Sequence, residues 1–246
     1  MFLKKTRKTV TSWPKKIPEI TSEQKVINDD WQKYFHKINK KKFSNIVDWG
    51  HKYIIKNSPT IFTHTLEIGP GLGEHLKYEK LSEKQKNNYI GIELRENMAK
   101  EIKKNYPFVK ILVGDCQKNI DYPNNYFDRI IAIHLLEHLP NLPMFLTQAH
   151  RLLSDRGTLQ IIIPCEGGLG YTIGRNLTTK KMFEKRYKVP YKDFIDYEHV
   201  NKAKEILAEI EKYFIVKNRK FYPLKIPIIA TNLIIGLTLS KKMLNS

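Results

Sequence analysis

The sequence predicts an α/β fold built on a doubly wound, mostly parallel sheet with helices on both faces. Short apolar runs recur at 61–68, 88–94, 109–113, 127–133 and 158–163. Helical patterns separate several of these runs, and a glycine-rich turn directly follows the first of them. Buried parallel strands are typically continuous apolar runs, and repeated strand–helix units assemble into one twisted sheet.

Two helices are expected before the first strand. Ser22, followed by Glu23 and Gln24, is typical of a helix start, and apolar side chains recur after it at helical spacing. A second helix is expected over 43–55, and Pro59 ends it, because the residue before a proline disfavours helical geometry. The aromatic cluster of the first helix is expected to pack on the domain, with covering of a ligand pocket as the alternative; its residues are Trp31, Tyr34 and Phe35.

Beyond the second strand, helices are expected over 96–105 and 143–153, and the pattern changes after the fifth strand. Residues 165–200 are rich in Gly, Tyr, Lys and Arg, and we interpret them as an insertion on the substrate side. A helix over 201–213 and two β segments, 214–222 and 231–239, then close the sheet with an antiparallel final strand. The predicted parts are a basic N-terminal helical extension over 1–58, a Rossmann-like core over 59–165, the insertion over 166–200, and the closing helix and strands over 201–246.

Charge and composition restrict the partners and the compartment. The 246 residues carry a formal net charge of +18, which favours anionic partners, although a coding bias toward lysine would give the same charge. Two cysteines, Cys116 and Cys165, cannot form a disulfide framework, so a reduced, cytoplasmic setting is expected. No secretory signal or membrane-spanning segment is predicted, because the apolar stretch at 226–239 is too short; peripheral membrane contact stays an alternative.

The strongest local motif is the segment LEIGPGLG at 66–73. Glycines in the first strand-to-helix turn let the backbone approach a ligand, and the exposed N–H groups favour negative or polar ligand atoms. The glycines alternate, unlike the G-x-G-x-x-G pattern of dinucleotide sites, which argues against a nicotinamide or flavin cofactor. A tight turn with a purely structural role is the alternative.

Three further segments occupy the ends of the next predicted strands. Glu93 ends the second strand, Asp115 follows the third, and the letters IHLLEHL at 133–139 follow the fourth. Ligands of doubly wound sheets bind beyond the carboxyl ends of the strands, where these segments are expected to meet. One carboxylate can accept two hydrogen bonds, so Glu93 suits a pair of ligand hydroxyls.

In this order the segments resemble class I S-adenosylmethionine (SAM)-dependent methyltransferases of type 11, over roughly residues 60–165. The resemblance implies that 59–165 binds SAM and that S-adenosylhomocysteine is the product. It places Glu93 on the ribose hydroxyls, Asp115 on the adenine amino group, and the glycine loop and His134 beside the methionine part. The implied cofactor-binding residues are Glu67, Gly69, Gly71, Gly73, Glu93, Leu94, Asp115, Cys116 and His134.

The second half is similar to uncharacterised bacterial methyltransferases linked to surface polysaccharide synthesis. The similarity lies in segments such as IPCEGG at 163–168 and YEHVN at 197–201. It implies methyl transfer to a hydroxyl or amine of a small-molecule or glycan acceptor. Alignment of acceptor and methyl group would then supply much of the rate, about 7–11 kcal/mol of the barrier.

Catalytic and substrate-binding residues are expected after the fourth strand and in the insertion. The candidate bases are His138, His134 and His199, because an imidazole can accept a hydroxyl proton near neutral pH. Arg175 or Arg186 would grip an anionic group on the acceptor, and Tyr171 and Tyr197 would position it by hydrogen bonds.

Several alternatives stay open. The basic, aromatic stretch 175–192 fits an RNA methyltransferase, and a non-catalytic SAM-binding module is a further alternative. An H-x-x-E-H zinc pattern is present at His134, Glu137 and His138, but Pro140 interrupts the helix that such a site needs. We predict no metal ligands, with magnesium on Glu137 and His138 as the alternative. Cys165 is expected to be a core residue, with a nucleophilic thiolate as the alternative.

Overall fold

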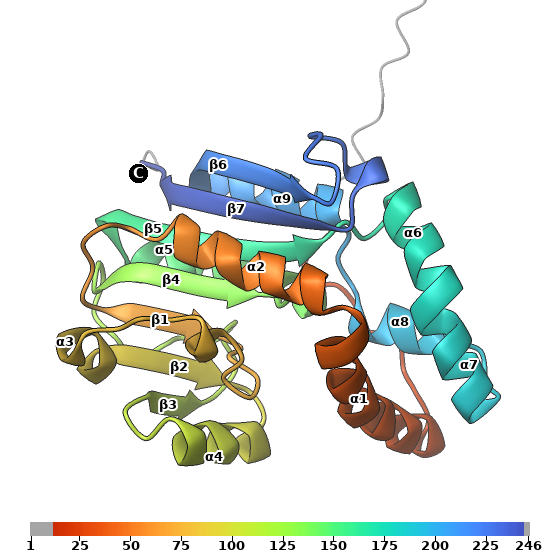
Figure 1. Cartoon of the computed structure of the whole chain (residues 1–246). Coiled ribbons are helices and arrows are strands. Elements are labelled where there is room, and N and C mark those ends of the chain that lie inside the picture. The colour runs from red at the N-terminus through yellow and green to blue at the C-terminus, as the bar shows by residue number, and fades with distance from the viewer. Residues whose placement is uncertain (1–11, 244–246) are drawn as a thin grey trace, which may run out of the picture.

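The computed structural model describes residues 12–243, with the backbone alone for 39–42. Seven strands form one sheet in the order β3-β2-β1-β4-β5-β7-β6 (Figure 1). They are β1 Thr65–Ile68, β2 Tyr89–Glu93, β3 Lys110–Val113, β4 Phe127–Ile133, β5 Leu153–Pro164, β6 Phe214–Tyr222 and β7 Ile234–Lys241. Strands β1 to β5 pair in parallel, and β7 runs antiparallel to both β5 and β6. The predicted fold class is confirmed.

Helices cover both faces of this sheet because side chains of each strand alternate in direction. Ile131 of β4 and Ile162 of β5 pack under helix α2 (Ser44–Lys56), against its Tyr53 and Ile54. Their neighbours Ile130 and Ile161 contribute to the opposite core, with α5 (Leu142–Leu152) and α9 (Ala203–Tyr213). Two short helices complete this part, α3 (Glu83–Asn87) and α4 (Glu96–Asn105).

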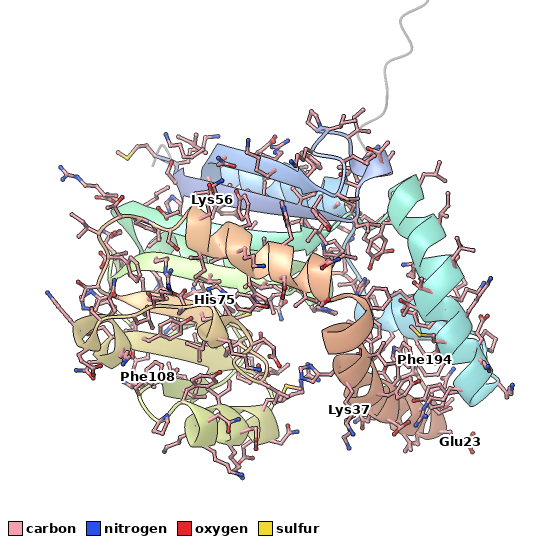
Figure 2. The ribbon with its side chains drawn as sticks, viewed as in Figure 1. Glu23, Lys37, Lys56, His75, Phe108 and Phe194 are labelled. Carbon is pink, nitrogen blue, oxygen red and sulfur yellow. The ribbon has the colours of Figure 1, made fainter. Side chains whose placement is uncertain are left out.

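The insertion is mostly helical and packs against the N-terminal helix. Helices α6 (Leu169–Arg175), α7 (Lys181–Tyr187) and α8 (Lys192–Glu198) follow β5, with a π-helical turn at Asn176–Lys180. Helix α1 (Ser22–Lys42) buries Trp31 against Phe183 and Phe194, so α1 and α7 lie side by side (Figures 1 and 2). The predicted aromatic helix face therefore packs on the insertion, where it forms a second, smaller core.

The predicted starts of three strands were wrong. Strand β1 begins at Thr65 rather than at 61, and β5 begins at Leu153 rather than at 158, with a register shift in its pairing with β4 between Phe127 and Arg129. The last strand begins at Ile234, because Ile229–Thr231 form a 3-10 turn before it. Among the described residues, no helix is both long and apolar enough to cross a bilayer.

A chain of buried polar side chains links α2 to the sheet. Arg129 of β4 donates to Glu79 at 2.7 Å, and Glu79 accepts from His75 Nε2 at 2.9 Å. His75 Nδ1 lies 3.2 Å from His51 Nδ1 on α2 (His75 is labelled in Figure 2). The carboxylate can only accept, so His75 donates from Nε2, and one of the two facing Nδ1 atoms donates to the other. These contacts join α2 to the sheet through buried polar groups.

Because of this chain, the folded protein is expected to lose stability as the pH falls. Burial and the neighbouring His75 lower the pKa of His51 to about 3. An unfolded histidine takes up a proton near pH 6.5, so the unfolded state binds more protons below that pH, and the His51 contribution declines by about 1.4 kcal/mol per pH unit between 6.5 and 3. Urea unfolding at pH 7 and pH 5.5 measures this slope. The variant His51→Gln should show a flatter slope over the same interval, and equal slopes would contradict the prediction.

Candidate active site

The glycine turn after β1 adopts a backbone that favours glycine. Gly69, Gly71 and Gly73 have φ of +66°, +60° and +77°. These left-handed values disfavour other residues, and a Cβ on Gly73 would lie 2.8 Å from the Tyr106 ring. The turn lies at the switch point of the sheet, where β1 pairs with β2 on one side and β4 on the other.

Glu93 binds this turn to the end of β2. Its Oε2 accepts from the Gly71 N–H at 3.1 Å, and its Oε1 accepts from the Arg95 N–H at 3.0 Å. The residue is 4% exposed. Each carboxylate oxygen has two lone pairs, so both oxygens can still accept a hydrogen bond from a ligand.

The end of β3 adds Asp115 to the same edge of the sheet. Its Oδ1 accepts from the backbone N–H of Gln117 at 2.9 Å and from the Gln117 side chain at 3.0 Å. Leu94 is 68% exposed beside Glu93, whereas Cys116 is buried in the main core. Leu94 thus offers an apolar surface next to the two acids, and Cys116 can meet a ligand only through its backbone.

Glu67 differs from the other predicted cofactor residues because its carboxylate lies in the interior. Its Oε2 accepts from the Tyr89 hydroxyl at 2.7 Å, and the residue is 3% exposed. Burial raises the pKa of this carboxyl, which is the direction expected for a carboxylate removed from water. The structure therefore places Glu67 beneath the turn, where its side chain supports β1 and β2.

The segment after β4 brings two histidines and a buried acid together. His134 has φ of +50°, and Leu136–His138 form a 3-10 turn. His134 Nδ1 lies 3.5 Å and His138 Nε2 lies 4.0 Å from Glu137 Oε1. Both histidine side chains are about one-third exposed, while that of Glu137 is 2% exposed. Burial raises the pKa of Glu137, but the two histidines outweigh it, and the net direction is downward.

The insertion contributes a third histidine, held by an acid that the sequence analysis missed. His199 Nδ1 lies 2.9 Å from Glu166 Oε2, and Arg175 pairs with Glu166 Oε1. The rings of His138 and His199 meet edge to face, with centroids 4.9 Å apart. Glu166 lies two residues beyond the end of β5, so the same edge-of-sheet argument that selected Glu93 and Asp115 could have found it.

The four predicted substrate residues lie in two different places. Arg175 packs over the Tyr171 ring at 5.6 Å and reaches the histidine cluster through Glu166. Arg186 instead pairs with Asp30 of α1 at 2.9 Å and lies 4.4 Å from the Tyr34 ring, so it joins α7 to α1. Tyr197 lies on α8, partly buried, and is two residues before His199.

The edge of the sheet therefore has two adjoining halves. The strand arrows of β1 to β5 point toward the same edge, which faces α1 and α8 (Figure 1). Gly71, Glu93 and Asp115 belong to the half built by β1, β2 and β3. The histidines and Glu166 belong to the half built by β4, β5 and the insertion. The sheet has the Rossmann-like, doubly wound architecture, in which ligands bind beyond the carboxyl ends of the strands at the switch point.

Comparison with known proteins narrows this class. Residues 66–161 match the model of a methyltransferase domain. Solved structures with the same fold include the PH0226 protein of Pyrococcus horikoshii OT3, at 14% identity and a TM-score of 0.59, covering 83% of this chain and 93% of that one. A TehB-like SAM-dependent methyltransferase of Corynebacterium glutamicum has 15% identity and a TM-score of 0.56, covering 87% and 99%. A SAM-dependent methyltransferase of Aquifex aeolicus has 21% identity and a TM-score of 0.51, covering 77% and 88%.

No curated protein matches the chain. Residues 66–161 are thus similar to a methyltransferase domain, and the solved structures share the fold of this chain.

Neither cysteine is expected to take part in the reaction. Burial raises the pKa of both the Cys116 and the Cys165 thiols to about 12, so both stay protonated at neutral pH, and Cys165 has no exposed surface. We expect Cys165→Ala to retain most of the methyl transfer of the unsubstituted protein, measured with labelled cofactor. Alkylation of the native protein by iodoacetamide, or complete loss of transfer in Cys165→Ala, would restore the covalent alternative.

Proposed function

We propose that this protein transfers a methyl group from SAM to a hydroxyl or amine of a small-molecule or glycan acceptor. The observation that carries the proposal is the contact between the Glu93 carboxylate and the Gly71 N–H at the switch point of the sheet. It places an acid with free lone pairs against a backbone that a ligand can approach closely.

The residues present fit the cofactor. Glu93 would accept hydrogen bonds from the ribose hydroxyls, Asp115 would accept from the adenine amino group, and the exposed Leu94 would contact the base. A Cβ at Gly69 would lie 3.1 Å from Leu135, and one at Gly71 would lie 3.4 Å from Glu74, so a larger residue would press against these side chains and displace the turn that would hold the cofactor. When bound, SAM supplies a methyl group activated by its sulfonium charge.

The acceptor would lie on the histidine side of the site. Nδ1 of His138 faces the Glu198 carbonyl at 2.7 Å, and Nδ1 of His199 faces Glu166. Both partners can only accept, so each ring donates from Nδ1 and keeps a lone pair on Nε2. An acceptor hydroxyl could lose its proton to such a nitrogen. Arg175 stays the candidate for an anionic group, although Glu166 already neutralises part of its charge.

The RNA alternative has less support from the side chains of the insertion. Arg186 is paired with Asp30, and Lys180 lies 3.9 Å from Glu184, so two of its cations already have acidic partners. An RNA acceptor would require steep salt dependence of transfer, because phosphate contacts release counterions. A glycan acceptor follows from the resemblance of the second half to polysaccharide-linked methyltransferases.

Incubation with methyl-labelled SAM and separated lipid, glycan, RNA and small-molecule fractions tests the proposal. Label should enter the glycan or small-molecule fraction and should be lost with Glu93→Ala. Label in the RNA fraction, with steep salt dependence of transfer, would show that the acceptor is RNA rather than a glycan or small molecule. Cofactor binding without transfer to any fraction would favour the non-catalytic alternative.

A further inference from the structure

We infer that Glu137, His138 and His199 form a binding site for one divalent first-row transition-metal ion. One ligand atom from each residue lies within 4.8 Å of those of the other two. The three residues come from the turn after β4 and from the end of α8, so only the docking of the insertion on the sheet creates the cluster.

The first supporting observation is an unpartnered oxygen. Glu137 Oε2 is buried and has no hydrogen-bond partner among the described residues, and its side chain is 2% exposed. Leaving a buried carboxylate oxygen without a hydrogen-bond partner destabilises the folded protein. The other oxygen, Oε1, lies 4.0 Å from His138 Nε2, so a cation held by this carboxylate would offset that destabilisation.

The second observation is the orientation of the two imidazoles. His138 Nδ1 lies 2.7 Å from the Glu198 carbonyl oxygen, and His199 Nδ1 lies 2.9 Å from Glu166 Oε2. Because a carbonyl and a carboxylate only accept, both rings hold their proton on Nδ1 and leave Nε2 as the available lone pair. Metal-binding histidines almost always donate their second N–H to a carboxylate or backbone carbonyl in this way.

Further contacts keep this arrangement rigid. Arg175 pairs with Glu166, and Asn28 of α1 donates to the Glu198 side chain at 2.5 Å. Asn201 donates to the carbonyls of Leu136 and Leu139 at 2.8 and 2.7 Å, which fixes the 3-10 turn that carries Glu137 and His138. Hydrogen bonds that hold the ligand side chains in place in this way are typical of metal sites.

The donor set indicates the kind of metal. Two imidazoles and one carboxylate suit zinc, iron, cobalt or manganese, whereas magnesium and calcium prefer oxygen ligands alone. Three protein ligands leave a coordination position open, as in catalytic sites. The inference rests on the proposed function and changes one role in it. With both Nε2 lone pairs on the metal, neither histidine would take the acceptor proton, and an acceptor oxygen bound to the metal would lose its proton to solvent more readily. The site differs from the H-x-x-E-H zinc pattern, since His199 takes the place of His134.

Titration of untagged, chelator-treated protein with Co²⁺ alone tests the site, without SAM or acceptor. We expect one Co²⁺ per chain with visible d–d absorption, displaced by an equivalent of Zn²⁺. His199→Gln and His138→Gln should each weaken binding at least 100-fold, and Glu166→Gln should weaken it about 10- to 100-fold by releasing the His199 ring.

His64→Gln is the matched control, because His64 is also a partly exposed histidine near a carboxylate, 3.6 Å from Asp128. It should leave Co²⁺ binding unchanged. Thermal unfolding of each variant without metal shows whether it folds, and Zn²⁺ should raise the Tm of the unsubstituted protein but not that of His199→Gln. Absence of stoichiometric binding, or equal binding by His199→Gln, overturns the site. Because no methyl transfer is measured, failure of the proposed function would not produce either result.

Discussion

Replacing Glu93 with alanine is expected to abolish the stabilisation of this protein by S-adenosylhomocysteine. At 100 times its dissociation constant, this nucleoside should raise the free energy of unfolding of the unsubstituted protein by about 2.7 kcal/mol. Glu93 would accept both ribose hydroxyls, and hydrogen bonds to a charged group contribute about 1.5–3 kcal/mol each. Two such bonds correspond to an affinity loss of at least about 100-fold. Thermal shift and calorimetric titration measure both quantities.

The control for this experiment is Glu96→Ala. Glu96 is the next acidic residue along the chain, in the first turn of α4, with a side chain that is 68% exposed and paired with Lys100. The Glu96→Ala variant should be stabilised by S-adenosylhomocysteine as much as the unsubstituted protein is. Glu93→Gln separates charge from structure, because the amide oxygen can still accept one backbone N–H. A normal response in Glu93→Ala would contradict the ribose assignment.

Replacing Arg129 with methionine is expected to lower the free energy of unfolding by about 3–5 kcal/mol, because it leaves a buried carboxylate without its cation. The side chains of Arg129 and Glu79 are 1% and 5% exposed. Arg129 also donates to Ser58 at 2.8 Å and stacks over the Phe62 ring at 4.2 Å. Urea unfolding at pH 7 measures the loss.

The double variant Arg129→Met with Glu79→Gln should recover much of that loss, because it removes the uncompensated charge as well. Burial raises the pKa of Glu79, but His75 and Arg129 outweigh it and the net direction is downward. The stability that this carboxylate contributes is therefore present above its unfolded pKa and is lost as the pH falls. The control is Lys86→Met, which removes the cation of the surface pair with Glu83. It should lower the free energy of unfolding much less than Arg129→Met does. Equal losses in Arg129→Met and in the double variant would show that packing, not the charge, dominates.

The elements that carry the proposed cofactor half of the site could be predicted from the sequence, because their signals are local. The strand predicted over 127–133 and the helix over 96–105 have the bounds found in the structure. The glycine turn and the acids Glu93 and Asp115 lie at strand ends, and the topology of a doubly wound sheet alone brings such ends to one edge. The role of Glu67 was less predictable, because a strand residue can face the ligand or the interior and its spacing fits both.

The sequence by itself therefore determined the sheet, its switch point and the residues beside it, since apolar periodicity and turn glycines act over a few residues. Only the tertiary structure decided the histidine half. Three contacts depend on how the insertion docks on the sheet and on α1. They are Arg175 with Glu166, His199 with His138, and Arg186 with α1. That docking rests on the packing of Trp31 with Phe183 and Phe194, contacts between segments distant in the chain, which no local pattern specifies.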